Sequence, residues 1–152
     1  MLAVTRRPNS VVEIRKALDP VKAHLEDVWA LASTKELPGP VMRRVVPGYC
    51  RSALEAVFIG MVRRRILADG RSHTDVEESL AKSGTLNTLA ALALFDDRDR
   101  GGDVMARLNS KIGGWAGDAF KNCKEGAHQE FTGDIQLLIR DTEKLAEKVQ
   151  AL

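Results

Sequence analysis

The segment CRSALEAVFIGMVRRRIL, residues 50–67, has the most regular apolar spacing in the chain. Its apolar side chains recur at intervals of three and four residues, which places them along one face of an α-helix. Pro47 and Gly48 precede the segment and Asp69 and Gly70 follow it, so we predict a helix bounded by these two pairs. The buried stripe would consist of Cys50, Ala53, Leu54, Val57, Phe58, Met61, Val62 and Leu67.

Helical spacing also predominates on both sides of this segment, whereas runs of β-branched residues and alternation with a period of two are scarce. The expected fold class is therefore all-α, a bundle of about five to seven helices. We assign residues 1–38 to an N-terminal helical extension or linker and residues 39–152 to the bundle domain. Besides residues 50–67, helices are predicted over residues 10–33, 72–82, 85–95, 103–124 and 134–152.

Local signals mark several of the helix ends. Ser10 would cap the first helix, in which Pro20 introduces a kink or a division. Ser72 and Asp75 have the spacing of a capping box. Thr132 or Asp134 would cap the last helix, and the apolar stripe of that helix suits either core packing or a dimer seam.

The composition is that of a globular protein of one domain. Of 152 residues, 44% are hydrophobic and 29% are charged, and the net charge is only +2. No apolar run is expected to span a membrane, and the N-terminus lacks the apolar segment of a signal peptide, so we predict a cytoplasmic location. Basic residues cluster at 43–44 and 63–65, which would bind phosphate if the clusters converge. Cys50 and Cys123 lack metal-ligand spacing and are expected to be reduced thiols.

A cation, an amide and a histidine lie close together before the last predicted helix. They are Lys121, Asn122 and His128, in the stretch FKNCKEGAH. A histidine transfers protons near neutral pH and a cation holds a phosphate, so the three side chains are typical of metal-free RNA cleavage. The alternative is structural, because a histidine at a helix end more often caps or packs than reacts.

Arg51 and Glu55 form the second candidate constellation. They are four residues apart and share a helix face at the edge of the buried stripe, where a charge needs a partner or a ligand. One interpretation is a local ion pair that supports the helix. The other is an arginine that Glu55 orients toward a phosphate in a cleft.

Other catalytic and cofactor motifs are absent from the sequence. It has no nucleophile elbow, no phosphate-binding loop of nucleotide hydrolases and no cluster with zinc spacing. We therefore expect no cofactor and no metal. His24 is predicted to lie on a solvated helix face, and His73 to cap or to lie on the surface.

Two motifs together resemble the HEPN superfamily: the run Tyr49-Cys50-Arg51-Ser52-Ala53-Leu54-Glu55, and the late stretch from Lys121-Asn122 to His128. The family motif is an arginine, four to six residues and a histidine, often with a polar residue after the arginine. Lys121 stands at the arginine position, with six residues before His128. Lysine keeps the charge but lacks the fork that binds phosphate through two bonds.

The resemblance implies a function and partners. It implies a metal-independent endoribonuclease domain of a bacterial toxin or anti-phage system, acting on RNA such as tRNA, often as a homodimer. His128 would transfer protons, Arg51 or Lys121 would stabilise phosphate charge, Glu55 would orient Arg51, and Asn122 would bind a phosphate or His128. Residues 40–150 also look similar to C-terminal regions of bacterial AAA or SMC-like ATPases, which implies an ATPase partner; a toxin would imply an antitoxin.

Two alternatives remain open at this point. One is an inert HEPN-like module that binds RNA or dimerises a partner ATPase, which the lysine at position 121 favours. The other is a helical adaptor unrelated to RNA. The three interpretations differ in one geometric expectation, because only a nuclease requires Arg51, Glu55 and His128 to converge on one cleft.

Overall fold

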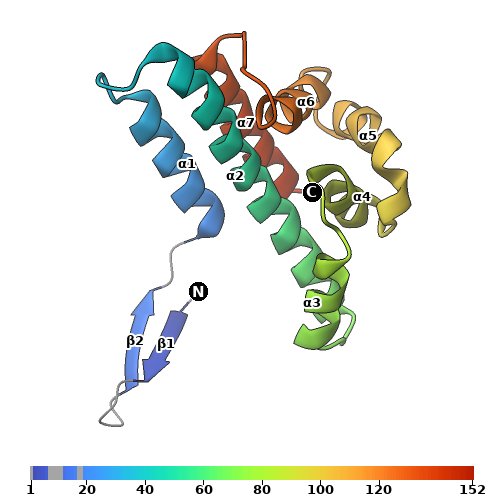
Figure 1. The fold of residues 1–152 in the computed structure, drawn as a ribbon. Coiled ribbons are helices and arrows are strands. Elements are labelled where there is room, and N and C mark those ends of the chain that lie inside the picture. The colour runs from blue at the N-terminus through green and yellow to red at the C-terminus, as the bar shows by residue number, and fades with distance from the viewer. Residues whose placement is uncertain (1, 7–11, 17–18) are drawn as a thin grey trace.

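A computed structural model describes residues 2–6, 12–16 and 19–152 of the chain. Within these ranges it contains seven α-helices, which confirms the predicted all-α bundle. The central helix is α2 (Gly39–Ala68), which packs against α1 (Pro20–Ala32), α3 (His73–Ala81), α4 (Leu86–Phe95), α6 (Ala116–Gly126) and α7 (Ile135–Gln150). Figure 1 shows α2 between α1 on one side and the α4–α6 group on the other. The remaining elements are α5 (Val104–Lys111) and a short 3-10 helix, η1 (Arg98–Asp103).

A β-hairpin precedes the bundle, and the prediction of helix from residue 10 is wrong there. Strands β1 (Leu2–Arg6) and β2 (Val12–Lys16) pair in antiparallel register, with Val4 opposite Ile14. Val12, Glu13, Ile14 and Arg15 alternate between apolar and charged residues, the period of a strand. The predicted cap Ser10 lies outside the described residues.

Helix α1 begins at Pro20, where we predicted a kink or a division of a longer helix. Proline fits the first turn because its missing N–H would have no helical partner there. The Asp19 carboxylate caps the helix by accepting a hydrogen bond from the Val21 N–H at 2.9 Å. Val21 and Val28 are buried, and α1 packs against α2 and α7. Helix α1 is therefore part of the bundle, although we assigned residues 1–38 to an extension outside it.

Helix α2 is longer than predicted, because it continues through Pro47 to begin at Gly39. It is also the one helix in the described part of the chain that is long and apolar enough, by length and composition, to cross a membrane. The expectation that no segment approaches this threshold was therefore wrong. Its most apolar window is 44% buried inside the bundle. The five helices around α2 account for its apolar character by core packing.

The remaining boundaries agree with the predictions except in one region. The capping box of Ser72 and Asp75 starts α3, Thr85 caps α4, and Asp134 caps α7. The single helix predicted over residues 103–124 is divided into α5 and α6 at Gly113, whose φ of 153° is a conformation that favours glycine. The segment between the helices predicted over residues 85–95 and 103–124 contains most of η1.

The apolar stripe of α7 lies in the core of the bundle. Leu145 and Val149 have no exposed surface, and Thr142 is buried with them. The Thr142 hydroxyl donates to the Leu138 carbonyl at 2.7 Å and contacts the Cys123 sulfur at 3.2 Å. Core packing thus accounts for the stripe that sequence spacing also allowed as a dimer seam.

Candidate functional site

Arg51 connects the two halves of the predicted site. Its Nε donates to the Glu55 Oε1 at 2.9 Å, and its Nη1 lies 2.9 Å from the His128 Nε2. Arg51 and Glu55 lie on α2, whereas His128 lies in the turn after α6, 77 residues later in the sequence. The structure therefore brings Arg51, Glu55 and His128 together within one chain.

The contact between Arg51 and His128 determines which ring nitrogen carries hydrogen. A guanidinium group has five N–H donors and no acceptor, so Arg51 must donate to the Nε2. A hydrogen bond at this contact therefore requires the tautomer that carries its hydrogen on Nδ1 and leaves Nε2 as the acceptor.

Burial strengthens the pair of Arg51 and Glu55. The side chain of Arg51 is 20% exposed and that of Glu55 is 36% exposed. A charged hydrogen bond at this depth is stronger than the same pair on an open surface. Glu55 thus fixes the direction in which the guanidinium group points.

Arg51 and His128 line a cleft of about 740 Å³, which we call the Arg51–His128 cleft. The cleft lies between α2, the C-terminal end of α6 and the first turn of α4. Its other lining residues are Gly84, Thr85, Leu86, Asn87, Lys124, Glu125 and Gln129.

Lys121 and Asn122 are not among the residues that line this cleft. Both are exposed on α6, and no side-chain hydrogen bond joins either of them to Arg51, Glu55 or His128. The cation that lines the cleft is Lys124, one turn later. Sequence reasoning missed Lys124, because Lys121 and Lys124, seven and four residues before His128, both have helical spacing to it.

Close packing fixes the end of α6 that carries His128. A β-carbon on Gly126 would lie 2.7 Å from the Cβ of Pro47, so only glycine permits this approach to α2. The His128 N–H donates to the Glu125 carbonyl at 3.0 Å, which continues the helical path into the turn. Gly126 therefore sets the distance between the ring and Arg51.

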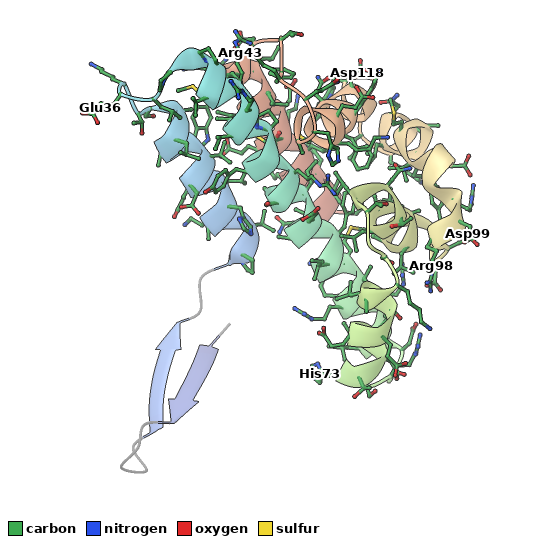
Figure 2. All side chains as sticks on the ribbon, in the orientation of Figure 1. Glu36, Arg43, His73, Arg98, Asp99 and Asp118 are labelled. Carbon is green, nitrogen blue, oxygen red and sulfur yellow. The ribbon has the colours of Figure 1, made fainter. Side chains whose placement is uncertain are left out.

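The loop after His128 is anchored to the start of α2. Pro47 has no N–H to offer the carbonyl of Arg43 four residues earlier. That carbonyl accepts a hydrogen bond from the Phe131 N–H at 3.1 Å. In return the Nη1 of Arg43 donates to the carbonyls of Phe131 and Gly133, at 3.0 and 2.7 Å (Figure 2 labels Arg43).

Several other candidates are occupied by structural contacts. Arg65 donates to the carbonyls of Ala93 and Leu92 at the end of α4, so this member of the basic cluster caps a helix. His73 is exposed at the start of α3, at the opposite end of the molecule from Arg43 in Figure 2. His24 is half-buried on α1.

The two cysteines are free and buried, and both belong to the core. The hydrogen bond with Cys50 and burial raise the pKa of the Cys123 thiol well above its usual value. A hydrogen bond from Cys123 lowers the pKa of Cys50. Neither sulfur lines the Arg51–His128 cleft.

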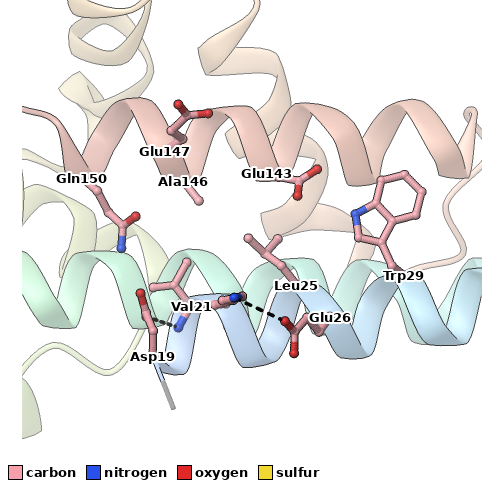
Figure 3. A pocket seen from close by; sticks show the side chains of 10 residues that line it. Asp19, Val21, Leu25, Glu26, Trp29, Glu143, Ala146, Glu147 and Gln150 are labelled. Atoms are coloured by element: carbon pink, nitrogen blue, oxygen red, sulfur yellow. Dashed lines mark hydrogen bonds and ion pairs between the residues drawn. The ribbon is translucent and has the colours of Figure 1, made fainter. Parts of the chain in front are cut away.

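A second pocket, of about 280 Å³, lies between α1 and α7 (Figure 3). It is bordered by four carboxylates, Asp19, Glu26, Glu143 and Glu147, with Lys22 as its cation. This charge would repel a phosphate. No group of three histidine, cysteine, aspartate or glutamate side chains with metal-site geometry occurs within the described residues.

Neither protein-family models, nor curated proteins, nor solved structures match this chain.

Proposed function

We propose that this chain is a metal-independent endoribonuclease domain of the HEPN type, acting in the cytoplasm in a bacterial toxin or anti-phage system. The observation that carries the proposal is that Arg51 contacts both Glu55 and His128, and that Arg51 and His128 line one cleft. A structural arginine needs only its carboxylate partner. His128 lies 77 residues later in the sequence and contacts the same guanidinium group. A side chain that can transfer protons therefore lies beside Arg51.

The proposed reaction is attack of the ribose 2′-hydroxyl on the adjacent phosphate. The 2′-oxygen forms a bond to phosphorus while the bond from phosphorus to the 5′-oxygen breaks. His128 accepts the 2′-hydroxyl proton, and the leaving 5′-oxygen takes a proton from water. The products are a 2′,3′-cyclic phosphate and a 5′-hydroxyl.

Arg51 would stabilise the phosphate charge that builds up in the transition state. Two of its five N–H donors are used by Glu55 and His128, which leaves three for phosphate oxygens. The Nε2 of His128 is the acceptor of the Arg51 hydrogen bond and also the atom that would take the 2′-hydroxyl proton. Phosphate binding would therefore draw Nη1 away from the ring and free this nitrogen to act as a base.

The family motif would assign the phosphate contact to Lys121, and this proposal assigns it to Lys124. Its ammonium group lines the cleft and would hold a non-bridging phosphate oxygen. Lys121 would contribute to general attraction of RNA from the exposed face of α6, where the neutral Asn122 could only donate a hydrogen bond to a phosphate.

A second candidate is an RNA-binding module without cleavage activity. The hydrogen bond that occupies the His128 Nε2 favours it, because the ring is not free to act as a base while the bond persists. The exposed position of Lys121 favours it as well. Homodimerisation, and association with an ATPase or an antitoxin, are proposals compatible with both candidates.

The decisive experiment is RNA cleavage in the presence of EDTA. Wild-type protein should produce 2′,3′-cyclic phosphate ends, and His128→Ala should abolish cleavage while circular dichroism shows the same helix content. His73→Ala, at an exposed position outside the cleft, is the matched control and should cleave like the wild type. Equal cleavage by wild type and His128→Ala would refute the nuclease; binding of RNA without cleavage by either would favour the second candidate.

A further inference from the structure

A groove of about 1,150 Å³ lies between α1 and α2, apart from the Arg51–His128 cleft. We infer that this groove holds the single-stranded RNA that flanks the scissile phosphate, with Arg63 and Arg64 binding its backbone. The inference rests on the proposed ribonuclease function and specifies its substrate as a stacked single strand. Figure 1 shows α1 and α2 side by side along the groove.

The charges that line the groove suit a polyanion. Lys22, Arg63 and Arg64 contribute three cations. Of its two carboxylates, Glu55 accepts from Arg51, whereas Asp19 caps α1 and keeps its charge. Lys22 pairs with Glu26 at 3.9 Å, so the positive charge that the groove offers to a phosphate backbone comes from Arg63 and Arg64.

The partners of the two arginines leave them available to a ligand. Arg63 lies 3.6 Å from a Glu77 carboxylate that is 71% exposed, a weak surface pair. Arg64 is exposed beside it. Arg65, the third arginine of the run, donates to carbonyls at the end of α4 and is not among the residues that line the groove.

Shared lining residues link the groove to the proposed catalytic cleft. A cavity of about 190 Å³ lies between the two, and it shares Glu55 and Ile59 with the groove. The same cavity shares Gly84 and Thr85 with the cleft. The three hollows therefore follow one side of α2 from His128 to Arg63.

The length of this path fits a short oligonucleotide. Arg51 and Arg63 are about 18 Å apart along α2, at a rise of about 1.5 Å per residue. A stacked strand advances about 3.4 Å per nucleotide, so about five nucleotides span the distance. Proteins that bind single strands combine a positively charged groove along the backbone with rings on which bases stack, and Arg63, Arg64 and His24 give this groove both features.

The groove has few groups that would distinguish one base from another. Its floor is formed by Ala56, Val57, Ile59 and Gly60, and His24 is the ring on its wall that could stack on a base. Binding should therefore depend on phosphates and on salt far more than on sequence.

The test compares substrates of two lengths. The variant is Arg63→Ala/Arg64→Ala, and the matched control is Arg44→Ala/Arg140→Ala, which removes two exposed arginines outside the groove. For a hexanucleotide, the groove variant should raise KM about tenfold at low salt and leave kcat unchanged. For a dinucleotide, which reaches only the cleft, both KM and kcat should stay at wild-type values.

A binding measurement separates this inference from the proposed activity. Fluorescence anisotropy with a 2′-O-methyl hexanucleotide, which cannot be cleaved, uses the His128→Ala background. Loss of both arginines should lower the slope of log affinity against log salt by about 1.4, at about 0.7 per phosphate contact. If the wild-type protein cuts no RNA, the nuclease is refuted, and this lower slope would still support the groove. Equal losses in the groove variant and the control would refute the groove, whether or not the protein cleaves RNA.

Discussion

Gly126 and Pro47 touch where the end of α6 meets α2, and a β-carbon at position 126 would lie 2.7 Å from the Cβ of Pro47. His128 follows two residues later and reaches Arg51, four residues beyond Pro47. One close backbone contact therefore sets the geometry of the whole candidate site.

Gly126→Ala should push α6 away from α2. Overpacking of this kind costs about 1–3 kcal/mol of unfolding free energy, and RNA cleavage should fall more than stability predicts, because His128 moves with the helix end. Urea denaturation and cleavage rates measure the two effects. Gly48→Ala is the control: its β-carbon meets nothing within 4 Å, and alanine should add up to about 1 kcal/mol to helix stability. Wild-type cleavage by Gly126→Ala would contradict the positioning role.

Glu55 is expected to act as a positioning residue for Arg51. Glu55→Ala should lower kcat for RNA cleavage about tenfold or more with a smaller change in KM, because the guanidinium group loses its orientation. Glu55→Gln should recover part of kcat, since its amide oxygen still accepts from the Arg51 Nε. Glu78→Gln, on exposed α3, should leave both constants unchanged. If Glu55→Ala lowers the free energy of unfolding but leaves kcat per folded molecule unchanged, the pair of Arg51 and Glu55 only supports the helix.

Lys124 and Lys121 lie on the same helix and offer a matched comparison. Lys124→Ala should raise KM for RNA severalfold, because Lys124 lines the cleft. Lys121→Ala should have a much smaller effect that disappears at physiological salt, as for an exposed charge. Steady-state cleavage at two salt concentrations makes the comparison. A larger effect at position 121 would assign the phosphate contact to the residue that the sequence motif suggests.

Leu145→Ala should lower the unfolding free energy by about 2–5 kcal/mol, because it opens a cavity in the core. The loss should not depend on protein concentration, since Leu145 is fully buried within one chain. Leu137→Ala, at a position that is 52% exposed on the same helix, should change stability little. Denaturation curves that shift with protein concentration only in the wild type would instead place α7 in a dimer interface.

The capping box of α3 makes a pH-dependent contribution to stability. Hydrogen bonds from the Ser72 N–H and hydroxyl lower the pKa of the Asp75 carboxyl below its ordinary value of 3.8. The stabilisation is therefore complete above pH 3.8 and is lost as the pH falls through the lowered pKa of the folded protein. Asp75→Asn should unfold at lower urea than wild type near neutral pH, and the difference should narrow in strong acid. A difference that stays constant across this range would exclude the carboxylate as its source.

Local patterns in the sequence were sufficient for much of this architecture. The helical spacing of residues 50–67 identified the central helix, and Ser72 and Thr85 marked helix starts that the structure retains. Arg51 and Glu55 were predictable as a pair because four residues make one turn of a helix. Each of these features depends on neighbours within a few positions.

Features that depend on distant partners were the ones missed. Pro47 was taken as a helix boundary, but the Phe131 N–H supplies the hydrogen bond that the helix loses there. The split at Gly113 and the strand at residues 12–16 also departed from the helical interpretation. The placement of Lys124 in the cleft in preference to Lys121 follows from the rotation of α6 against α2, which spacing along one helix does not determine.

The hydrogen bond between the Phe131 N–H and the Arg43 carbonyl has a consequence for exchange with solvent deuterium. A loop amide ordinarily exchanges quickly, but this one is held by a helix carbonyl that has lost its usual partner. Its exchange requires the loop to detach from α2, and detachment leaves that turn of the helix without a bond. The Phe131 amide should therefore be protected, and its exchange rate should report how often the segment that carries His128 leaves the bundle.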